Sequence, residues 1–249
     1  MGLFDKKECG ICGGKIGLLG GTKLEDGNLC GDCHKKLSPY YRPGKSTSIN
    51  DVRAHLEYRE ANKALVQEFN ATKIMGKTTK VYVDEEKGQF LVSGSSNFKS
   101  TNPDVMNLTD VSGCDLDTKE SRTELKRKDK DGNSISYNPK KYNYSYDLSL
   151  YIYVNNPYFD KITIDLIDGD VDIEANEGQT PNVASNAVYK EAERTGTEIK
   201  RTFASARNLK RMEEKKAAEP KKAVTCPHCG ATTIPDASGC CEYCGSSVG

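Results

Sequence analysis

Eight of the ten cysteines stand in four pairs of the form C-x-x-C, two near each end of the 249-residue chain. Two residues between cysteines allow a tight turn that directs both sulfurs at one point, and two such pairs complete a tetrahedron of thiolates around Zn²⁺. The spacing predicts two zinc ions per chain, one at each end. The expected ligands are Cys9, Cys12, Cys30 and Cys33 at one site and Cys226, Cys229, Cys241 and Cys244 at the other.

The cysteine pattern leaves several points open. The N-terminal pairs would also suit two disulfides, or a redox motif, although a redox motif needs one pair in a βαβ context rather than two matched pairs. Gly13 follows Cys12 and can adopt the positive φ that turns backbone N–H groups toward sulfur. Cys240 adjoins Cys241 and could replace it, but the two-residue spacing favours Cys241. His34 is surplus to a four-cysteine set.

The remaining sequence offers little that points to catalysis. The chain has three histidines, none of them in a recognisable motif, and it has neither a phosphate-binding loop nor a nucleophile elbow. Four thiolates also leave no open coordination position for the water that a hydrolytic zinc needs. We therefore expect a non-enzymatic binding or adaptor protein with structural zinc. A nucleic-acid-binding or ribosome-associated zinc-ribbon protein is the alternative.

Composition and charge bear on the kind of partner and on the cellular location. Lysine plus arginine equals aspartate plus glutamate at 36 each, so the net charge gives no argument for nucleic acid or an anionic membrane as partner. We therefore favour a protein partner. The start of the chain lacks the apolar segment of a secretion signal, and no apolar run is long enough to span a bilayer. These features predict a cytoplasmic protein, in which cysteines bind metal more readily than they form disulfides.

The N-terminal segment, residues 1–45, also resembles a known family. The similarity rests on the four cysteines together with Gly13, Lys15-Ile16-Gly17, Asp26-Gly27 and Lys35-Lys36-Leu37-Ser38-Pro39. These residues resemble a bacterial N-terminal domain of unknown function. The resemblance implies a zinc-binding module placed ahead of a β-rich domain, often with a zinc ribbon elsewhere, and it implies no particular biochemical activity.

Composition shifts along the chain predict an α+β protein in four parts. Residues 1–45 form the N-terminal zinc module, 49–210 a helix-flanked antiparallel β domain, 211–224 a charged tether and 225–249 a C-terminal zinc ribbon. Strands followed by a final helix make the middle domain resemble a pleckstrin-homology-like fold. That resemblance concerns the fold alone and implies no ligand.

Two helices are expected to flank the middle domain. The first begins at Asn50 or Asp51 and runs to about residue 75, and its apolar residues recur at helical spacing. They are Ala54, Tyr58, Ala61, Leu65 and Phe69. His55, beside this stripe, fits a surface or core-edge position. The second helix begins near Pro181 or Asn182, runs to about residue 214 and buries a similar stripe. That stripe consists of Val188, Ala192, Ile199 and Phe203.

Alternating residues predict the strands. Residues 80–84 and 89–93 form a hairpin, and even-numbered residues from Tyr142 to Val154 line one buried face opposite Ile162 and Ile164. The tyrosines are in phase with leucine and isoleucine, which favours a core role over a base-stacking platform. Cys114 lies in a weaker strand and is expected to be buried and inert. Residues 121–141 mix charges of both signs, which favours a solvated hairpin tip over a nucleic-acid arm.

Overall fold

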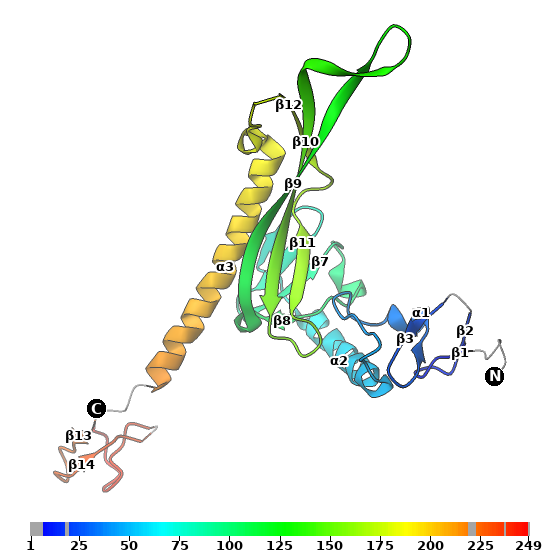
Figure 1. Cartoon of the computed structure of the whole chain (residues 1–249). Coiled ribbons are helices and arrows are strands. Elements are labelled where there is room, and N and C mark those ends of the chain that lie inside the picture. Colours follow the sequence, from blue (N-terminus) through cyan, green and yellow to red (C-terminus); the bar gives the residue numbers. More distant parts are fainter. Residues whose placement is uncertain (1–6, 18–19, 219–222, 237, 249) are drawn as a thin grey trace. The chain divides into compact units, whose positions relative to one another are not determined.

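The computed structural model describes residues 7–17, 20–218, 223–236 and 238–248, without the side chains of residues 210, 213, 214 and 216–218. The chain divides into two compact units, one ending at Arg207 and one beginning at Asn208. The expected mixture of helices and mostly antiparallel sheets is present (Figure 1). A four-cysteine cluster lies near each terminus. Part of the expected tether and the first residues of the N-terminal module lie outside the described residues.

The N-terminal elements are very short. Strand β1 (Lys7–Glu8) pairs with β2 (Lys15–Ile16), β3 (Thr22–Lys23) pairs with β4 (Asn28–Leu29), and α1 spans Gly31–His34. Two-residue strands contribute few backbone hydrogen bonds, so the module depends on packing and on its cysteines. Its small core contains Ile16, Leu24, Leu29 and Leu37, and it also includes Val52. The packing of the module therefore extends beyond residue 45.

Helix α2 spans Ile49–Glu68 and starts under a capping box, in which the Ser48 hydroxyl accepts from the Asp51 amide and the Asp51 carboxylate accepts from the Ser48 amide. Ser48 is thus the N-cap, and Asp51 stands at the third helical position. The helix ends before Phe69 instead of near residue 75, because residues 73–75 form strand β5 (Lys73–Met75).

The buried face of α2 differs from the expected one. Ala54, Ala61 and Leu65 are exposed, and the helix instead buries the residues Val52, His55, Arg59, Asn62 and Val66. These follow one another at steps of three and four, so the helical period is right but the face is rotated. Polar partners in residues 102–105 allow this face to be buried without unpaired charge.

The first sheet has the order β5-β6-β7-β8, with β6 at Lys80–Asp84, β7 at Gln89–Ser93 and β8 at Met106–Asn107. The predicted hairpin of residues 80–84 and 89–93 is confirmed. Both faces of this sheet are covered: Tyr82 and Leu91 pack with Val66 and Phe69 from the α2 segment, while alternate residues face the second sheet. Those alternate residues are Val81, Val83, Phe90 and Val92.

The second sheet is built around β10 (Ser134–Val154), which pairs with β9 (Val111–Lys128), β11 (Lys161–Asp165) and β12 (Val171–Asn176). The even-numbered residues of β10 from Tyr144 to Val154 are buried, and Ile162 stands opposite Ile152, as predicted. Strand β9 is much longer than the weak strand expected around Cys114. It pairs with β10 along nearly its whole length, into the charged segment.

Helix α3 spans Ala187–Ala218, and its first part lies along the second sheet (Figure 1). Ala192, Ile199 and Phe203 are buried as expected, but Val188 is 51% exposed and Tyr189 takes its place in the core. Because the helix continues to Ala218, the first part of the segment expected as a tether is helical.

Short elements complete the described residues. Three 3₁₀ turns span Phe98–Ser100, Leu108–Asp110 and Val183–Ser185, and the C-terminal cysteines flank β13 (Val224–Thr225) and β14 (Thr232–Thr233). The middle strands form two separate four-stranded sheets, so a pleckstrin-homology-like fold is not confirmed. Among the described residues, no helix has the length and apolar character needed to cross a membrane.

Candidate metal centres

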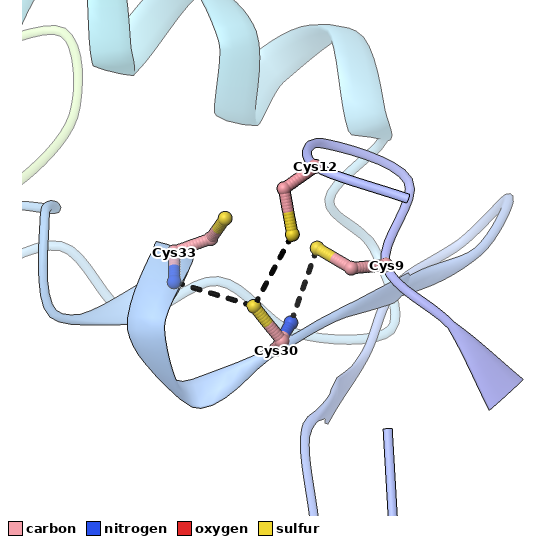
Figure 2. Close-up of side chains that lie close together, drawn as sticks. All are labelled: Cys9, Cys12, Cys30 and Cys33. Atoms are coloured by element: carbon pink, nitrogen blue, oxygen red, sulfur yellow. Dashed lines mark hydrogen bonds between the residues drawn. The ribbon is translucent and has the colours of Figure 1, made fainter. Parts of the chain in front are cut away.

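The first cluster brings together sulfurs from two turns. Cys9 and Cys12 lie in the turn between β1 and β2, Cys30 precedes α1, and Cys33 lies within that helical turn (Figure 2). All four Sγ atoms lie within 4.8 Å of one another, and the Cys12 and Cys30 sulfurs are 3.7 Å apart. The amides of Cys30 and Cys33 donate to the sulfurs of Cys9 and Cys30, each at 3.4 Å. These N–H groups stabilise negative charge on sulfur.

The second cluster repeats this arrangement at the other end. The sulfurs of Cys226 and Cys244 are 3.6 Å apart, those of Cys229 and Cys241 are 3.7 Å apart, and all four lie within 4.8 Å of one another. Cys241, not Cys240, belongs to the cluster, since the Cys240 sulfur instead contacts the Ser238 carbonyl at 3.8 Å. The structure thus places the eight predicted sulfurs in two separate groups of four.

Three of the four C-x-x-C turns have the same backbone conformation. In each, a glycine after the second cysteine donates its N–H to the carbonyl of the first cysteine at 2.8 to 2.9 Å. These glycines, Gly13, Gly230 and Gly245, have φ between 69° and 76°. A left-handed residue at this point reverses the chain behind the sulfurs, and glycine adopts it without a Cβ clash. After Cys33 the glycine is replaced by His34, the last residue of α1, whose N–H still donates to the Cys30 carbonyl at 2.9 Å.

The geometry fits a bound tetrahedral metal. A tetrahedron with metal–sulfur bonds of about 2.3 Å has sulfur–sulfur edges of about 3.8 Å. The 3.6 to 3.7 Å separations match this edge and exceed the disulfide bond length of about 2.05 Å. All ten cysteines are free, so the disulfide alternative is wrong. Four thiolates in a tetrahedron suit Zn²⁺, and iron binds the same donor set.

The pKa values of the thiols show how the clusters share charge. Burial raises the pKa of Cys9, but the backbone N–H groups of Cys12 and Cys30 outweigh it and lower that pKa to about 6. The backbone N–H and the side chain of Ser246 lower the pKa of Cys244 to about 6. Burial and neighbouring thiols raise the pKa of Cys33. Each cluster therefore contains at least one cysteine whose pKa is lowered, which favours the thiolate form that a metal binds.

The burial of His55 is a feature that the sequence did not reveal. His55 is completely buried, with its ring stacked on Tyr41 at 4.3 Å and edge-on to Tyr158 at 4.6 Å. Neither ring nitrogen has a hydrogen-bond partner among the described residues. Burial, and then the charge of Arg59, lowers the pKa of His55 to about 4. The expected surface or core-edge position is therefore wrong, and the histidine is a neutral core residue.

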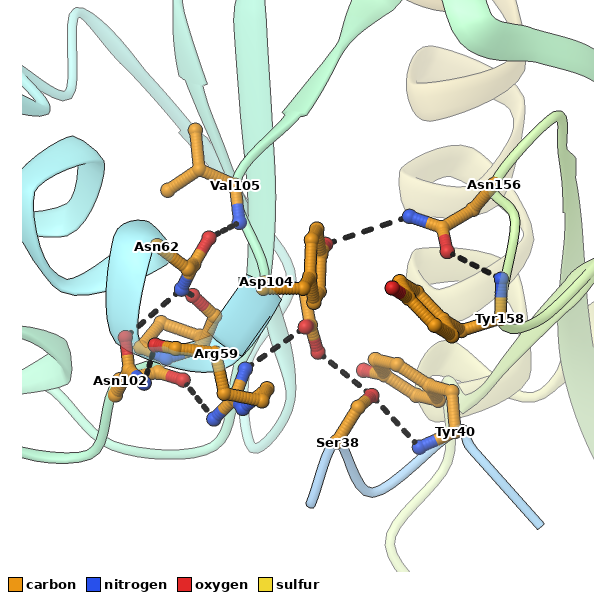
Figure 3. A network of polar contacts seen from close by, with 11 residues as sticks. Ser38, Tyr40, Arg59, Asn62, Asn102, Asp104, Val105, Asn156 and Tyr158 are labelled. Carbon is orange, nitrogen blue, oxygen red and sulfur yellow. Dashed lines mark hydrogen bonds and ion pairs between the residues drawn. The ribbon is translucent and has the colours of Figure 1, made fainter. Parts of the chain in front are cut away.

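A buried polar network ties the segment after the N-terminal cluster to the middle domain (Figure 3). The Arg59 guanidinium lies 2.7 Å from the Asp104 carboxylate, whose other oxygen accepts from the Ser38 hydroxyl at 2.8 Å. Arg59 also donates to the Asn102 carbonyl, and Asn102 has a positive φ of 49°. No spacing rule links Ser38, Arg59 and Asp104, which are far apart in the chain. Their charges are paired with each other, which indicates a structural role.

Comparison with known proteins bears on the N-terminal segment. Residues 7–55 match the family model described as a domain of unknown function, DUF4428, which covers about a fifth of the chain. No curated protein matches the chain, and no solved structure matches it. The matched segment contains the whole first cluster and ends inside α2. Residues 7–55 thus form a DUF4428 domain.

Proposed function

We propose that this chain is a zinc-binding, non-enzymatic adaptor protein in which two structural zinc ions hold small modules that contact a protein partner. The observation that carries the proposal is the pair of four-sulfur clusters, each with the spacing of a tetrahedral site. Four thiolates fill the coordination shell, so a zinc ion there has no position for a water nucleophile. Its contribution is folding free energy for modules with very small cores.

Other features support a structural role for the metal. Among the described residues, no further group of three or more histidine, cysteine or carboxylate side chains could hold a metal ion. The three histidines are divided between a buried core position, His55, and two positions beside the cysteines, His34 and His228, outside both ligand sets. We propose a cytoplasmic location, where reduced thiols remain available to zinc.

The C-terminal module offers a contact surface. Tyr243 lies between two cluster cysteines and is 71% exposed, and Ile234, after β14, is 50% exposed. Large apolar side chains on a module this small give a partner protein something to bury, and tyrosine is enriched at such contacts. This exposure supports a protein partner more directly than the zinc sites themselves do.

Elemental analysis tests the metal part of the proposal. Protein purified without a metal-binding tag should contain about two equivalents of zinc. Cys12→Ser and Cys229→Ser should each lose one equivalent, because each removes one corner of a cluster. Cys114→Ser, which alters a buried cysteine outside both clusters, is the matched control and should retain both. Iron in place of zinc, or one equivalent in the unaltered protein, contradicts the proposal.

Crosslinked capture tests the adaptor part. The zinc-loaded full chain and Ile74→Ser, which alters an apolar residue that is 55% exposed, should capture the same protein. Ile234→Ser combined with Tyr243→Ser should lose it while keeping both zinc ions. If the double variant captures the same protein with the same yield, the C-terminal module is not the contact surface.

A further inference from the structure

The long hairpin of β9 and β10 continues past the edge of the second sheet. Strand β12 pairs with β10 only from Lys141 to Tyr146, whereas β9 and β10 pair again from Lys126 to Lys128 and from Ser134 to Ser136. Residues 126–140 therefore form a two-stranded arm, and no third strand from the described part of the chain pairs with it. Figure 1 shows this arm bending away at the end of the green strands, near the register shift between Ser136 and Lys141.

Charge on the arm is unbalanced, although the whole chain is neutral. The arm contains five lysines or arginines and two aspartates. Lys126, Arg127 and Lys128 are exposed, and within the described part of the chain none of them forms an ion pair. The hairpin tip is solvated, as the sequence favoured, but its exposed charges are mainly positive.

Two carboxylates near the arm, those of Asp129 and Glu124, accept hydrogen bonds within the hairpin. One Asp129 carboxylate oxygen accepts from the amides of Asp131 and Asn133 at 2.9 and 2.8 Å, so this side chain closes the turn at the tip. At the base, the Glu124 carboxylate accepts from the Ser136 hydroxyl at 2.6 Å and lies 4.0 Å from Lys140. Lys126, Arg127 and Lys128 are thus available to an outside anion, while the carboxylates of Asp129 and Glu124 accept hydrogen bonds within the hairpin.

The register distributes these cations over both faces of the arm. Lys126 and Lys128 stand opposite Ser136 and Ser134, so two lysines and two small hydroxyl residues share one face. Arg127 stands opposite Ile135 on the other face. There the Tyr137 ring lies 5.8 Å from the Arg127 guanidinium and 5.3 Å from the Lys141 ammonium. A ribbon that is cationic on both faces suits a groove with anions on both walls.

The dimensions agree with such a groove. Three cross-strand pairs at about 3.3 Å per residue extend about 10 Å, and the two strands are separated by about 4.8 Å. The major groove of DNA is about 8.5 Å deep and about 12 Å wide, and it admits a two-stranded ribbon with its side chains. The deep major groove of an RNA duplex is too narrow for this.

We propose that the arm of residues 126–140 binds duplex DNA, with Lys126, Lys128 and Arg127 contacting phosphates from within the major groove. This goes beyond the proposed zinc-dependent adaptor role and does not depend on it. Phosphate contacts fix position without reading sequence, so the binding is expected to be of low sequence specificity and to weaken steeply with salt.

Fluorescence anisotropy with a labelled 20-base-pair duplex of mixed sequence tests this, using the zinc-loaded full chain. Lys126→Gln combined with Lys128→Gln should weaken binding about tenfold at low salt and reduce the slope of log affinity against log salt by about 2, since each lost phosphate contact removes about 0.9. Lys45→Gln combined with Lys190→Gln makes the same change in net charge at exposed positions outside the arm and should behave like the unaltered protein.

Three results would overturn the proposal. The first is no binding of the duplex at 50 mM salt by the unaltered chain. The second is an equal loss of affinity in both double variants, which would reduce the effect to net charge. The third is equally tight binding to a single strand or to polyglutamate, which would make the arm a general anion contact or a contact for an acidic protein.

Discussion

Replacing Asp104 by alanine should destabilise the unit that contains it by about 3 to 5 kcal/mol. The Asp104 side chain is completely buried, and the Arg59 side chain is 9% exposed. Each charge has therefore lost its hydration and is stabilised by the other. Breaking a buried ion pair by removing one partner costs about 3 to 5 kcal/mol, because the remaining charge is left without solvent. Ser38 also loses the acceptor for its hydroxyl.

Thermal unfolding followed by circular dichroism measures this loss. For a unit of this size, each kcal/mol lowers the melting temperature by about 2 to 4 °C, so we expect a decrease of about 10 °C. Glu60→Ala is the matched control, since the Glu60–Lys63 pair is 72% and 58% exposed and should contribute less than about 1 kcal/mol. Arg59→Met combined with Asp104→Leu should recover much of the loss, because no charge is then left buried.

The reasoning is refuted if Asp104→Ala lowers stability by less than about 1 kcal/mol, or if the double variant is less stable than the single one. Either result would mean that water reaches Arg59 and that the segment after the N-terminal cluster is not fastened through Asp104.

Three further predictions follow from buried groups. The pKa of His55 is lower in the folded state than in the unfolded chain, so the free energy of unfolding should fall as the pH drops from about 6.5 toward 4. Urea unfolding at pH 5 should show a loss of about 1 to 2 kcal/mol, and this loss should be absent in His55→Phe. Burial raises the pKa of Cys114 to about 11, so thiol labelling of the zinc-loaded protein should spare it until denaturant is added, and rapid native labelling would contradict its burial. Gly196→Ala should cost about 1 to 2 kcal/mol in urea unfolding, although alanine is the better helix former, because its Cβ would clash with the Leu116 side chain and lie 2.8 Å from that of Leu166. A stabilised variant would show that both leucines move aside without cost.

The features that were predictable from the sequence depend on short-range patterns. Each C-x-x-C pair fixes its own turn, and the alternation from Tyr142 to Val154 reports a strand with one buried face. In both cases the residues that matter are only two or three positions apart. The joining of two pairs into one cluster was also predictable, since four sulfurs around one ion is the usual arrangement for this motif.

The features that were missed depend on partners that are distant in the chain. The helical period of α2 was visible, but its buried face is set by Arg59 and Asn62, whose partners lie about forty residues away. The sequence-based prediction assigned Leu65 to the buried face because it considered apolar residues alone. Likewise, the charged residues of β9 show no strand pattern of their own, and they are extended because β10 pairs with them.

Helix α2 has a consequence for where this chain can be divided. The DUF4428 match ends at residue 55, the N-terminal core reaches Val52 of this helix, and Arg59 of this helix belongs to the network to the middle domain. Both contacts belong to one uninterrupted helix, so the angle between them is set by helical phase. A single residue inserted between Val52 and Arg59 would rotate one attachment by about 100° relative to the other. A fusion of the N-terminal module to another domain through this helix must therefore keep the number of residues between the two attachments.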